Sequence, residues 1–363
     1  MTTNLNSEKT IIIVGANSVH TLRFIKGVLH FYTNVVFITN NSEGLTLGSN
    51  VLVCRLNFKL TSLKTRYQIA RIIKQYNNPI IHIHQANSYA FHTLKGVQLA
   101  ATKCTTILTT WGSDILVLPH KNIIYKRIVQ FNLSNCDMVT SDSLYMSAQI
   151  MRLAHKVKQL HTINFGMEKF PASSCDLTQK QDIILSNRLH KPLYNIDKII
   201  RAFAKLRSNP KYTQYKLVIA ATGTETENLK HLVNRLKLND WVEFVGMVSY
   251  QKLQHLYQIA KIIISIPDSD ATSMSLLESM AFGCYPILSN IPANLEWIID
   301  GINGTICQNT TQLHYNIEQA LTEISNIEKH EQINQLNYNI IKQKAVFRNN
   351  IKQFINLYKS APA

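Results

Sequence analysis

The chain has 363 residues, of which 45% are hydrophobic and 17% charged, so it is long enough for two globular domains with cores of their own. Its formal net charge of +16 indicates a partner of opposite sign, either a nucleic acid or an anionic membrane surface. The sequence shows no nucleic-acid-binding signature, no apolar run of about 18 residues and no signal-peptide pattern. These absences argue against a nucleic-acid-binding protein, an integral membrane protein and a secreted protein.

Strand signals alternate with helical stretches along nearly the whole chain. The first half predicts strands near residues 10–15, 34–39, 51–54, 79–84, 105–110, 137–140 and 160–164. The second half predicts strands near 182–187, 215–221, 241–245, 261–266, 284–289 and 304–307. Such alternation is typical of parallel sheets with helices on both faces, so we predict an α/β protein with two doubly wound, Rossmann-like domains.

A polar stretch with Gly, Pro and Ser, residues 165–181, separates the two sets of strands. We therefore expect a first domain over residues 1–168 and a second over 169–340. A final helical segment is expected over 341–363.

The first predicted strand runs into a short polar loop that reads GANS over residues 15–18. The loop leads into a helix that carries His20. It is not G-x-G-x-x-G, the fingerprint of a dinucleotide-binding fold. The sequence therefore disfavours an oxidoreductase of the dehydrogenase type.

The cysteine and histidine patterns point away from a metal centre. The six cysteines are scattered without a C-x-x-C pair, which is typical of reduced thiols in a cytoplasmic protein. His82 and His84 alternate in one predicted strand, an arrangement that more often reflects packing or the lining of a cleft than metal binding. We expect no metal site and no bound cofactor.

The stretch SDATSMSLLE, residues 269–278, follows a strand signal that ends at Pro267. We expect Asp270 in a loop at the carboxyl end of the strand, and Glu278 about two turns into a helix that begins near Thr272. The N–H groups of a helix start favour an anion, and ligands of open α/β sheets bind at this edge. The alternative is that Asp270 only caps the helix and Glu278 is a solvated surface residue.

A longer pattern surrounds this pair over residues 261–304. It consists of two acidic residues with seven residues between them, a strand entry with small residues, and then E…DG-x-NG. The residues are Asp270, Glu278, Ala281, Gly283, Pro286, Glu296, Asp300, Gly301, Asn303 and Gly304. In order and spacing, the pattern resembles the donor-binding region of retaining glycosyltransferases of the GT-B fold, family 4, also described as glycosyl transferases group 1. Most members of that family have Glu where this chain has Asp270.

The resemblance implies a GT-B fold, in which two Rossmann-like domains face a cleft and the last helix returns to the first domain. Residues 184–206 are similar to the family segment in which an Arg and a Lys hold the donor diphosphate. The matching residues here are Arg188 and Lys191. For both Arg188 and Lys191 the alternative is a surface salt bridge.

Residues 109–119 resemble a loop of the first domain that faces the donor sugar and often carries a His. This chain has Trp111 at the imidazole position and Asp114 three residues later. For Asp114 the alternative is a Gly-Ser-Asp turn that caps a helix. The first loop and helix also resemble those of the family, which adds three residues that contact acceptor or donor: Gly15, Asn17 and His20.

The family chemistry explains these residue types. Cleavage of a sugar–phosphate bond leaves a diphosphate whose charge must be neutralised by groups already in place. Arg188 would supply a planar fork and Lys191 a point charge. The helix start at Thr272 and Ser273 would add backbone N–H groups. The resemblance implies catalytic roles for three acids, with Asp270 near the sugar and Glu278 on the ribose hydroxyls: Asp270, Glu278 and Asp114.

Two basic amphipathic stretches lie in the first half, which is the acceptor side in this fold. Residues 61–78 place Ile69, Ile72, Ile73 and Tyr76 on one helical face and Lys64, Arg71 and Lys74 on the other. Residues 120–131 mix Lys121, Lys126 and Arg127 with apolar residues. Both can be solvated helix faces. With the charge of +16 they favour docking on an anionic inner membrane leaflet.

These observations predict a retaining, metal-independent glycosyltransferase. Its donor would be a nucleotide-diphospho-sugar, UDP- or GDP-linked, and its acceptor a membrane-associated glycan or lipid-linked sugar of lipopolysaccharide, O-antigen or other surface polysaccharide assembly. The protein would be cytoplasmic and peripheral on the inner face of the cytoplasmic membrane, with no nucleic-acid partner. The alternatives are an epimerase-like enzyme on the same fold, or a non-catalytic partner subunit of a glycosyltransferase.

Overall fold

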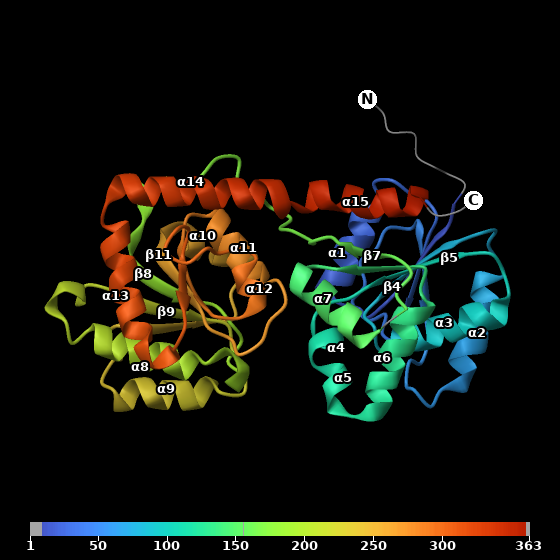
Figure 1. Cartoon of the computed structure of the whole chain (residues 1–363), viewed down its shortest axis with the longest axis horizontal. Helices are drawn as coiled ribbons and strands as arrows, with labels where there is room; N and C mark the ends of the chain where they lie inside the picture. The colour runs from blue at the N-terminus through green and yellow to red at the C-terminus, as the bar shows by residue number, and fades with distance from the viewer. Residues whose placement is uncertain (1–8, 155, 361–363) are drawn as a thin grey trace. The chain divides into compact units, whose positions relative to one another are not determined.

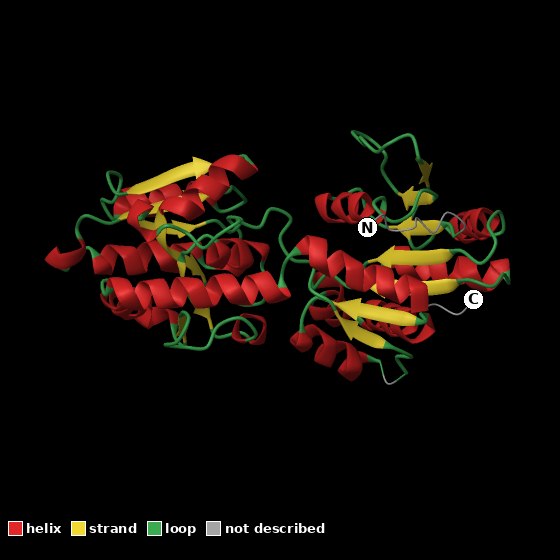
Figure 2. Cartoon of the chain, turned by 90° about the horizontal axis from the view of Figure 1, so that it is seen from above, coloured by secondary structure: helices red, strands yellow, loops and turns green. Residues whose placement is uncertain are grey.

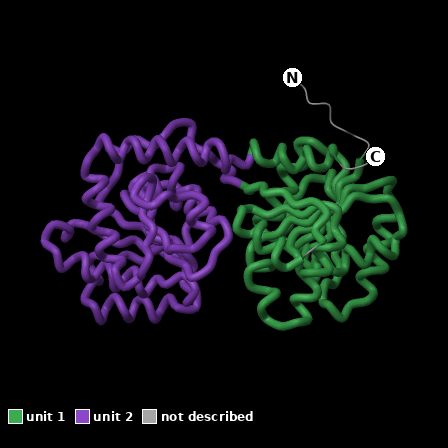
Figure 3. Tube along the Cα trace, in the orientation of Figure 1, with its two compact units in different colours: residues 1–165, 348–363 green, residues 166–347 purple. Residues whose placement is uncertain are grey.

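The computed structural model describes residues 9–154 and 156–360. The chain forms two compact units (Figure 3). Unit 1 contains residues 1–165 and 348–363, and unit 2 contains residues 166–347. The expected boundaries at 168/169 and 340/341 thus differ by a few residues from the observed ones. The final helix belongs to unit 1.

Unit 1 contains a seven-stranded parallel sheet with the strand order β3-β2-β1-β4-β5-β6-β7. Figure 1 labels its strands β4, β5 and β7. Most of its strands are buried along their whole length, as expected for parallel strands with helices on both faces. The strands are β1 (Ile11–Val14), β2 (Val35–Thr39), β3 (Val51–Arg55), β4 (Ile80–His84), β5 (Thr105–Thr109), β6 (Met138–Ser141) and β7 (Leu160–Thr162).

Helices cover both faces of this sheet. One core cluster joins the strands to α2, α3, α6 and α7. On the other face Phe24 of α1 packs against Phe354 of α15, with ring centroids 5.2 Å apart. The helices are α1 (Val19–Val28), α2 (Leu63–Ile73), α3 (Ser88–Ala100), α4 (Ser113–Leu116), α5 (Leu118–Lys121), α6 (Ile123–Asn135), α7 (Leu144–Leu153) and α15 (Phe347–Ser360).

Local sequence fixes several of these helix starts. The side chains of Ser18, Asn87, Asn122 and Ser143 each accept a backbone N–H of the first turn that follows. Such a cap contributes about 1 kcal/mol to helix stability. The caps at Ser18, Asn87 and Ser143 place a helix within a few residues of the preceding strand, so that these loops at the carboxyl edge of the sheet are short.

Unit 2 contains a six-stranded parallel sheet with the order β10-β9-β8-β11-β12-β13. One core cluster fills the face under α8, α9 and α13, and a second fills the face under α10, α11 and α14. Figure 2 shows helices on both sides of each sheet. The strands are β8 (Gln181–Ser186), β9 (Lys216–Ala220), β10 (Val242–Gly246), β11 (Ala260–Ser265), β12 (Tyr285–Ser289) and β13 (Thr305–Cys307).

The helices of unit 2 include one with a sharply divided surface, α8, whose buried face is built from Ile196, Ile199, Ile200, Phe203 and Leu206. Each fully buried side chain of this size contributes about 1.5–3 kcal/mol. The helices are α8 (Ile196–Leu206), α9 (Thr226–Arg235), α10 (Tyr250–Ile259), α11 (Met274–Ala281), α12 (Pro292–Leu295), α13 (Leu313–Ile324) and α14 (Ile327–Lys344), with short 3-10 turns at Leu177–Gln179, Pro192–Tyr194, Pro210–Tyr212 and Thr310–Gln312.

Within residues 9–154 and 156–360, no helix is both long and apolar enough to cross a membrane.

Candidate active site

Arg188 follows β8 at the carboxyl edge of the sheet of unit 2. Its side chain is 11% exposed, and its Nη2 atom lies 2.7 Å from Oδ2 of Asp270, in the loop after β11. Because β8 and β11 are neighbours in the sheet, their parallel register brings these two residues to one edge. The pair is mostly buried and therefore differs from the exposed salt bridge that is the alternative for Arg188.

Two serines and a tyrosine complete the surroundings of the Arg188 guanidinium. Its Nη1 atom donates to the hydroxyl of Ser273 and, over 3.4 Å, to that of Ser275. The two serine hydroxyls are 2.8 Å apart. The ring of Tyr194 lies against the guanidinium, 4.4 Å from Cζ to the ring centroid. The fork is thus held from several sides before any donor arrives, which is what stabilisation of a leaving anion requires.

Asp270 is held by its own loop as well as by Arg188. Its Oδ1 atom accepts the N–H of Ala271 over 3.0 Å. Burial raises the pKa of Asp270 above the ordinary aspartate value, and the Arg188 guanidinium acts against that rise. A carboxylate whose pKa is raised by burial and lowered by a neighbouring cation, at the edge where ligands bind, is a candidate catalytic residue.

Glu278 is oriented by a chain of two hydrogen bonds. The hydroxyl of Tyr257, a fully buried residue of α10, donates to Oε2 of Glu278 over 3.2 Å. The amide of Asn187, the neighbour of Arg188 in the chain, donates to the Tyr257 hydroxyl over 2.6 Å. Burial raises the pKa of Tyr257 well above its ordinary value, and the Glu278 carboxylate adds to the effect. Tyr257 therefore stays a hydrogen-bond donor and holds the carboxylate in place.

Helix α11 begins at Met274, slightly later than the expected start near Thr272. Ser273 is its N-cap, but its side chain makes no capping hydrogen bond. The Ser273 hydroxyl contacts Arg188 and Ser275 instead. As a result Glu278 lies little more than one turn into the helix, and the helix start lies beside the guanidinium, where both favour an anion.

Asp268 and Asp270 together form an Asp-x-Asp pattern, so the expectation of metal-independent chemistry cannot rest on the absence of such a pattern. Both carboxylates already have protein partners: Asp268 Oδ1 accepts from the Asn195 amide over 2.8 Å, and Asp270 pairs with Arg188. Among the residues described by the structure, no group of three or more His, Cys, Asp and Glu side chains could hold a metal ion.

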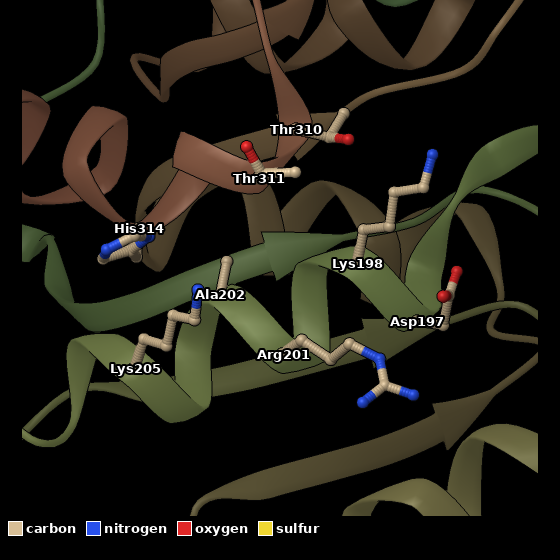
Figure 4. A pocket seen from close by; sticks show the side chains of 8 residues that line it. All are labelled: Asp197, Lys198, Arg201, Ala202, Lys205, Thr310, Thr311 and His314. Atoms are coloured by element: carbon tan, nitrogen blue, oxygen red, sulfur yellow. The ribbon is translucent and has the colours of Figure 1, made fainter.

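Lys191 does not join the Arg188 cluster. It is exposed and lines a hollow of about 410 Å³ with Lys198, Arg201 and Arg235. Figure 4 shows the neighbouring hollow of about 350 Å³, lined by residues of α8 and by Thr310, Thr311 and His314. Neither hollow includes Arg188, Asp270 or Glu278.

In unit 1, Asp114 is buried, and its carboxylate accepts backbone N–H groups of two loops and not of the first turn of α4, so it does not cap that helix. Its Oδ2 atom accepts the N–H of Ala86 over 2.7 Å, and its Oδ1 atom accepts that of Trp111 over 2.9 Å. Burial raises the pKa of Asp114, while these backbone bonds act against the rise. Because both oxygens hold loop backbone, the structure gives Asp114 a positioning role for the loop that carries Trp111, and not that of a free base.

The first loop of unit 1 meets the same tryptophan. The rings of His20 and Trp111 lie 4.9 Å apart, and Trp111 also stacks on His84 at 5.7 Å. A Cβ atom on Gly15 would lie 3.0 Å from that of His84, so glycine permits this close approach. Asn17 donates to the backbone carbonyl of Glu43 over 2.9 Å. Partial desolvation lowers the pKa of His20 below its ordinary value, and the Arg23 charge lowers it further.

Two family models match the chain. The model described as "Glycosyl transferases group 1" matches residues 168–342, and the model described as "Glycosyl transferase 4-like" matches residues 9–143. The chain belongs to the group 1 glycosyl transferases, enzymes of the GT4 type with the GT-B fold.

Relatives and solved structures agree with this assignment. N-acetyl-alpha-D-glucosaminyl L-malate synthase of Bacillus anthracis is 21% identical over 80% of this chain and 76% of its own. Alpha-monoglucosyldiacylglycerol synthase of Streptococcus pneumoniae is 28% identical over 38% of this chain and 30% of its own. The structure of Anabaena HepE in complex with UDP superimposes with a TM-score of 0.77 at 14% identity, over 97% of this chain and all of that one.

Sequence reasoning missed several residues that surround the two acids of this glycosyltransferase. Tyr194 and Ser275 lie within stretches that were singled out, and Asn187 precedes Arg188. Tyr257 left no signal, because it lies on a different helix and its hydroxyl reaches Glu278 only through the packing of α10 beside α11.

Proposed function

We propose that this glycosyltransferase transfers a sugar, with retention of configuration, from a nucleotide-diphospho-sugar held at the carboxyl edge of the unit 2 sheet. The observation that carries the proposal is the Arg188 guanidinium, fixed by Asp270, Ser273 and Tyr194 beside the start of α11. A cationic fork next to a helix start suits a diphosphate. Asp270 would lie next to the reacting sugar, and Glu278, held by Tyr257, would grip the ribose.

The donor is proposed to carry UDP in preference to GDP. The support is the complex of HepE with UDP, a protein whose fold this chain shares. Bound nucleotide stabilises the folded chain by mass action, so a thermal-shift series over UDP, GDP, ADP and CMP should single out UDP. A larger rise in melting temperature with GDP than with UDP would show that the donor carries GDP.

The reaction is proposed to need no divalent metal. Arg188 and the first turn of α11 would meet the diphosphate charge, and Asp268 and Asp270 already pair with Asn195 and Arg188. We expect turnover to survive EDTA at concentrations that remove magnesium and manganese. An absolute requirement for added metal would instead assign Asp268 and Asp270 to metal binding.

The acceptor is proposed to be a glycan or lipid-linked sugar at the inner face of the cytoplasmic membrane, where the enzyme would dock as a peripheral protein. The unequal distribution of net charge between the two units supports docking on a membrane. Unit 1 carries 20 Lys and Arg against 5 Asp and Glu, a net charge of +15, whereas unit 2 carries 18 against 17, a net charge of +1. A surface of one sign attracts a surface of the other.

Exposed apolar residues occur beside the basic ones. Ile123 and Ile124, at the start of α6, are 60% and 64% exposed, and the exposed Lys126 and Arg127 follow them. The name of the Streptococcus pneumoniae relative, a diacylglycerol glycolipid synthase, also favours a lipid acceptor. The name of the Bacillus anthracis relative, a glucosaminyl L-malate synthase, favours a small acid as the second candidate.

The test is an assay with purified enzyme, UDP-sugars and two acceptor preparations: anionic membranes with their glycolipids, and soluble hydroxy acids such as L-malate. We expect UDP release that depends on one of them, with the anomeric configuration retained in the product by NMR. Conversion of free UDP-sugar without acceptor would indicate the epimerase alternative. Absence of binding of all four nucleotides, UDP, GDP, ADP and CMP, would indicate a non-catalytic partner subunit.

A further inference from the structure

A hollow of about 700 Å³ opens at the carboxyl ends of β2 and β3 in unit 1. Asn40, which follows β2, and Arg55, the last residue of β3, form one side of it. The segment 56–59 forms another side, and Ser88 and Tyr89, at the start of α3, form the third. The hollow therefore lies at the edge of the sheet outside which ligands of parallel sheets bind.

The walls of the hollow are held by contacts within the protein. The Tyr89 hydroxyl donates to Oδ1 of Asn40 over 2.7 Å, and the rings of Tyr89 and Phe58 lie 4.3 Å apart. The Nε atom of Arg55 donates to the Asn40 carbonyl over 3.3 Å. The hollow therefore has its shape without a ligand, which lowers the entropic cost of binding one.

These contacts occupy side-chain oxygens of the residues that line the hollow, and they leave most of the side-chain N–H and O–H donors available for a ligand. Asn40 Oδ1 is taken by Tyr89, and Asn57 Oδ1 accepts the N–H of Lys59 over 3.0 Å, so both amides have their NH₂ groups left for a ligand. Arg55 keeps both Nη groups, Lys59 its ammonium group and Ser88 its hydroxyl. No Asp or Glu lines the hollow, and within the described part of the chain no carboxylate pairs with Arg55 or Lys59.

We propose that this hollow binds an oxyanion, a carboxylate or a phosphate, on the acceptor of the transferase. Two cations and several neutral donors without a competing carboxylate suit such a group, and the start of α3 adds a favourable dipole. The net charge of +15 on unit 1 would draw an anionic acceptor toward it. The inference rests on the proposed function, since it names the class of acceptor that function uses.

The test measures binding of small probes to the purified full chain by calorimetry at low salt. Glucuronate and L-malate represent carboxylates, glycerol 3-phosphate represents phosphates, and glucose is the neutral probe. We expect at least one anion to bind and glucose not to bind. Binding of the carboxylates alone or of the phosphate alone identifies which oxyanion the acceptor carries. If none of the anions binds, the inference is wrong.

Two variants locate the site. Arg55→Met with Lys59→Met removes both cations, and Asn40→Asp replaces a donor by a charge while it keeps the oxygen that Tyr89 needs. Each variant should lower the affinity for the anion by about tenfold or more, because hydrogen bonds to charged groups are stronger than those between neutral groups. The matched controls are Arg152→Met with Lys156→Met, and Asn77→Asp, which make the same charge changes on exposed residues of unit 1 outside the hollow.

The controls are repeated with the test variants at about 0.1 M salt, where distant charges are screened over about 10 Å, and they should leave anion binding within about twofold. Equal loss in control and test variants would show that the anion senses only the net charge, and would overturn the assignment to this hollow. UDP affinity is measured on the same samples. UDP binding that persists when anion binding is lost separates failure of the hollow from failure of the donor site.

Discussion

Asp270→Asn removes the negative charge beside Arg188 while it keeps the size of the side chain. If Asp270 acts near the reacting sugar, kcat should fall by about a hundredfold or more, and donor affinity should change far less. Asp270→Glu keeps the carboxylate but displaces it, and a misplacement of about 1 Å costs on the order of a hundredfold. This variant should therefore retain some activity, well below that of the parent enzyme. The measurement is kcat beside the donor Kd from calorimetry. Normal turnover of Asp270→Asn would reduce Asp270 to a partner that only holds Arg188.

The acid side of the pH profile reports on the same carboxyl group. Burial raises the pKa of Asp270 and Arg188 partly offsets this, so kcat should be level above the folded-state pKa and fall as the pH drops through it. Arg188→Met removes the offsetting charge and should move this acid limb to higher pH. The stability effect has the opposite sign: the burial penalty on ionised Asp270 is present above the folded pKa and is relieved as the pH falls through it. An acid limb that stays in place in Arg188→Met would contradict the coupling.

Tyr257→Phe tests whether Glu278 is held for donor binding. The ring keeps its packing, but Glu278 loses a donor and Asn187 loses an acceptor. We expect donor affinity to fall about fivefold, from the roughly 1 kcal/mol of one hydrogen bond. Glu278→Gln should weaken donor binding more, because the amide offers one acceptor oxygen where the carboxylate offers two.

The matched control is Tyr338→Phe, which removes a tyrosine hydroxyl that donates to the carbonyls of Pro171 and Ala172 elsewhere in unit 2. It should lower stability by a similar amount and leave the donor Kd unchanged. Equal donor affinity in Tyr257→Phe and the parent enzyme would show that the bond to Glu278 is only structural.

At the scale of elements, one lysine holds three chain segments of unit 2 together. The Lys180 ammonium donates to the carbonyls of Tyr257, Ala260 and Phe282 over 2.8, 2.9 and 2.8 Å, where α10 ends, β11 begins and α11 ends. Lys180→Met leaves these carbonyls without that donor and should cost about 2 kcal/mol of unfolding free energy. The measurement is urea unfolding, with the exposed Lys230→Met as the control that should change little. Unchanged unfolding of Lys180→Met would mean that water replaces the lysine at no cost.

Most of the strands could be predicted from the sequence, because interior parallel strands are short continuous runs of Ile and Val between polar loops. The break between α14 and α15 could not be predicted from the sequence. The helical pattern continues across Ala345 and Val346, but Met167 donates to the Ala345 carbonyl over 2.7 Å and accepts from the Phe347 N–H over 2.9 Å. This backbone pairing between distant segments ends α14, so the expected helix over 341–363 is in fact the end of one helix and the whole of another.

The residues of the candidate site that follow from sequence spacing could be predicted, and those that depend on the packing of helices could not. Arg188, Asp270 and Glu278 lie in loops or helix starts directly after strands, so the sheet register brings them to one edge. Lys191 has the right charge, but it is the N-cap residue of the 3-10 turn Pro192–Tyr194, and it lines a separate hollow that does not include Arg188. Tyr257 could be found only from the packing of α10.

At the scale of the whole molecule, the unequal charge of the two units predicts how the enzyme meets a membrane. With a net charge of +15, unit 1 should bind vesicles that contain anionic lipids and not neutral ones. Binding should weaken strongly between 0.1 M and 1 M salt, because the screening length falls from about 10 Å to about 3 Å. Equal binding to neutral vesicles would remove electrostatics as the cause.

The exposed cations of α2 allow the docking unit to be identified. Lys64, Arg71 and Lys74 each contribute about 1 kcal/mol near an anionic surface, so their joint reversal to Glu should lower vesicle affinity by at least about a hundredfold. The matched control reverses three cations on α8 of unit 2, Lys198, Arg201 and Lys205 (Figure 4), for the same change in net charge. Co-sedimentation with vesicles should then show loss for the α2 variant and near-normal binding for the α8 variant. The reverse ranking would place the membrane surface on unit 2, and equal loss would show that only total charge matters.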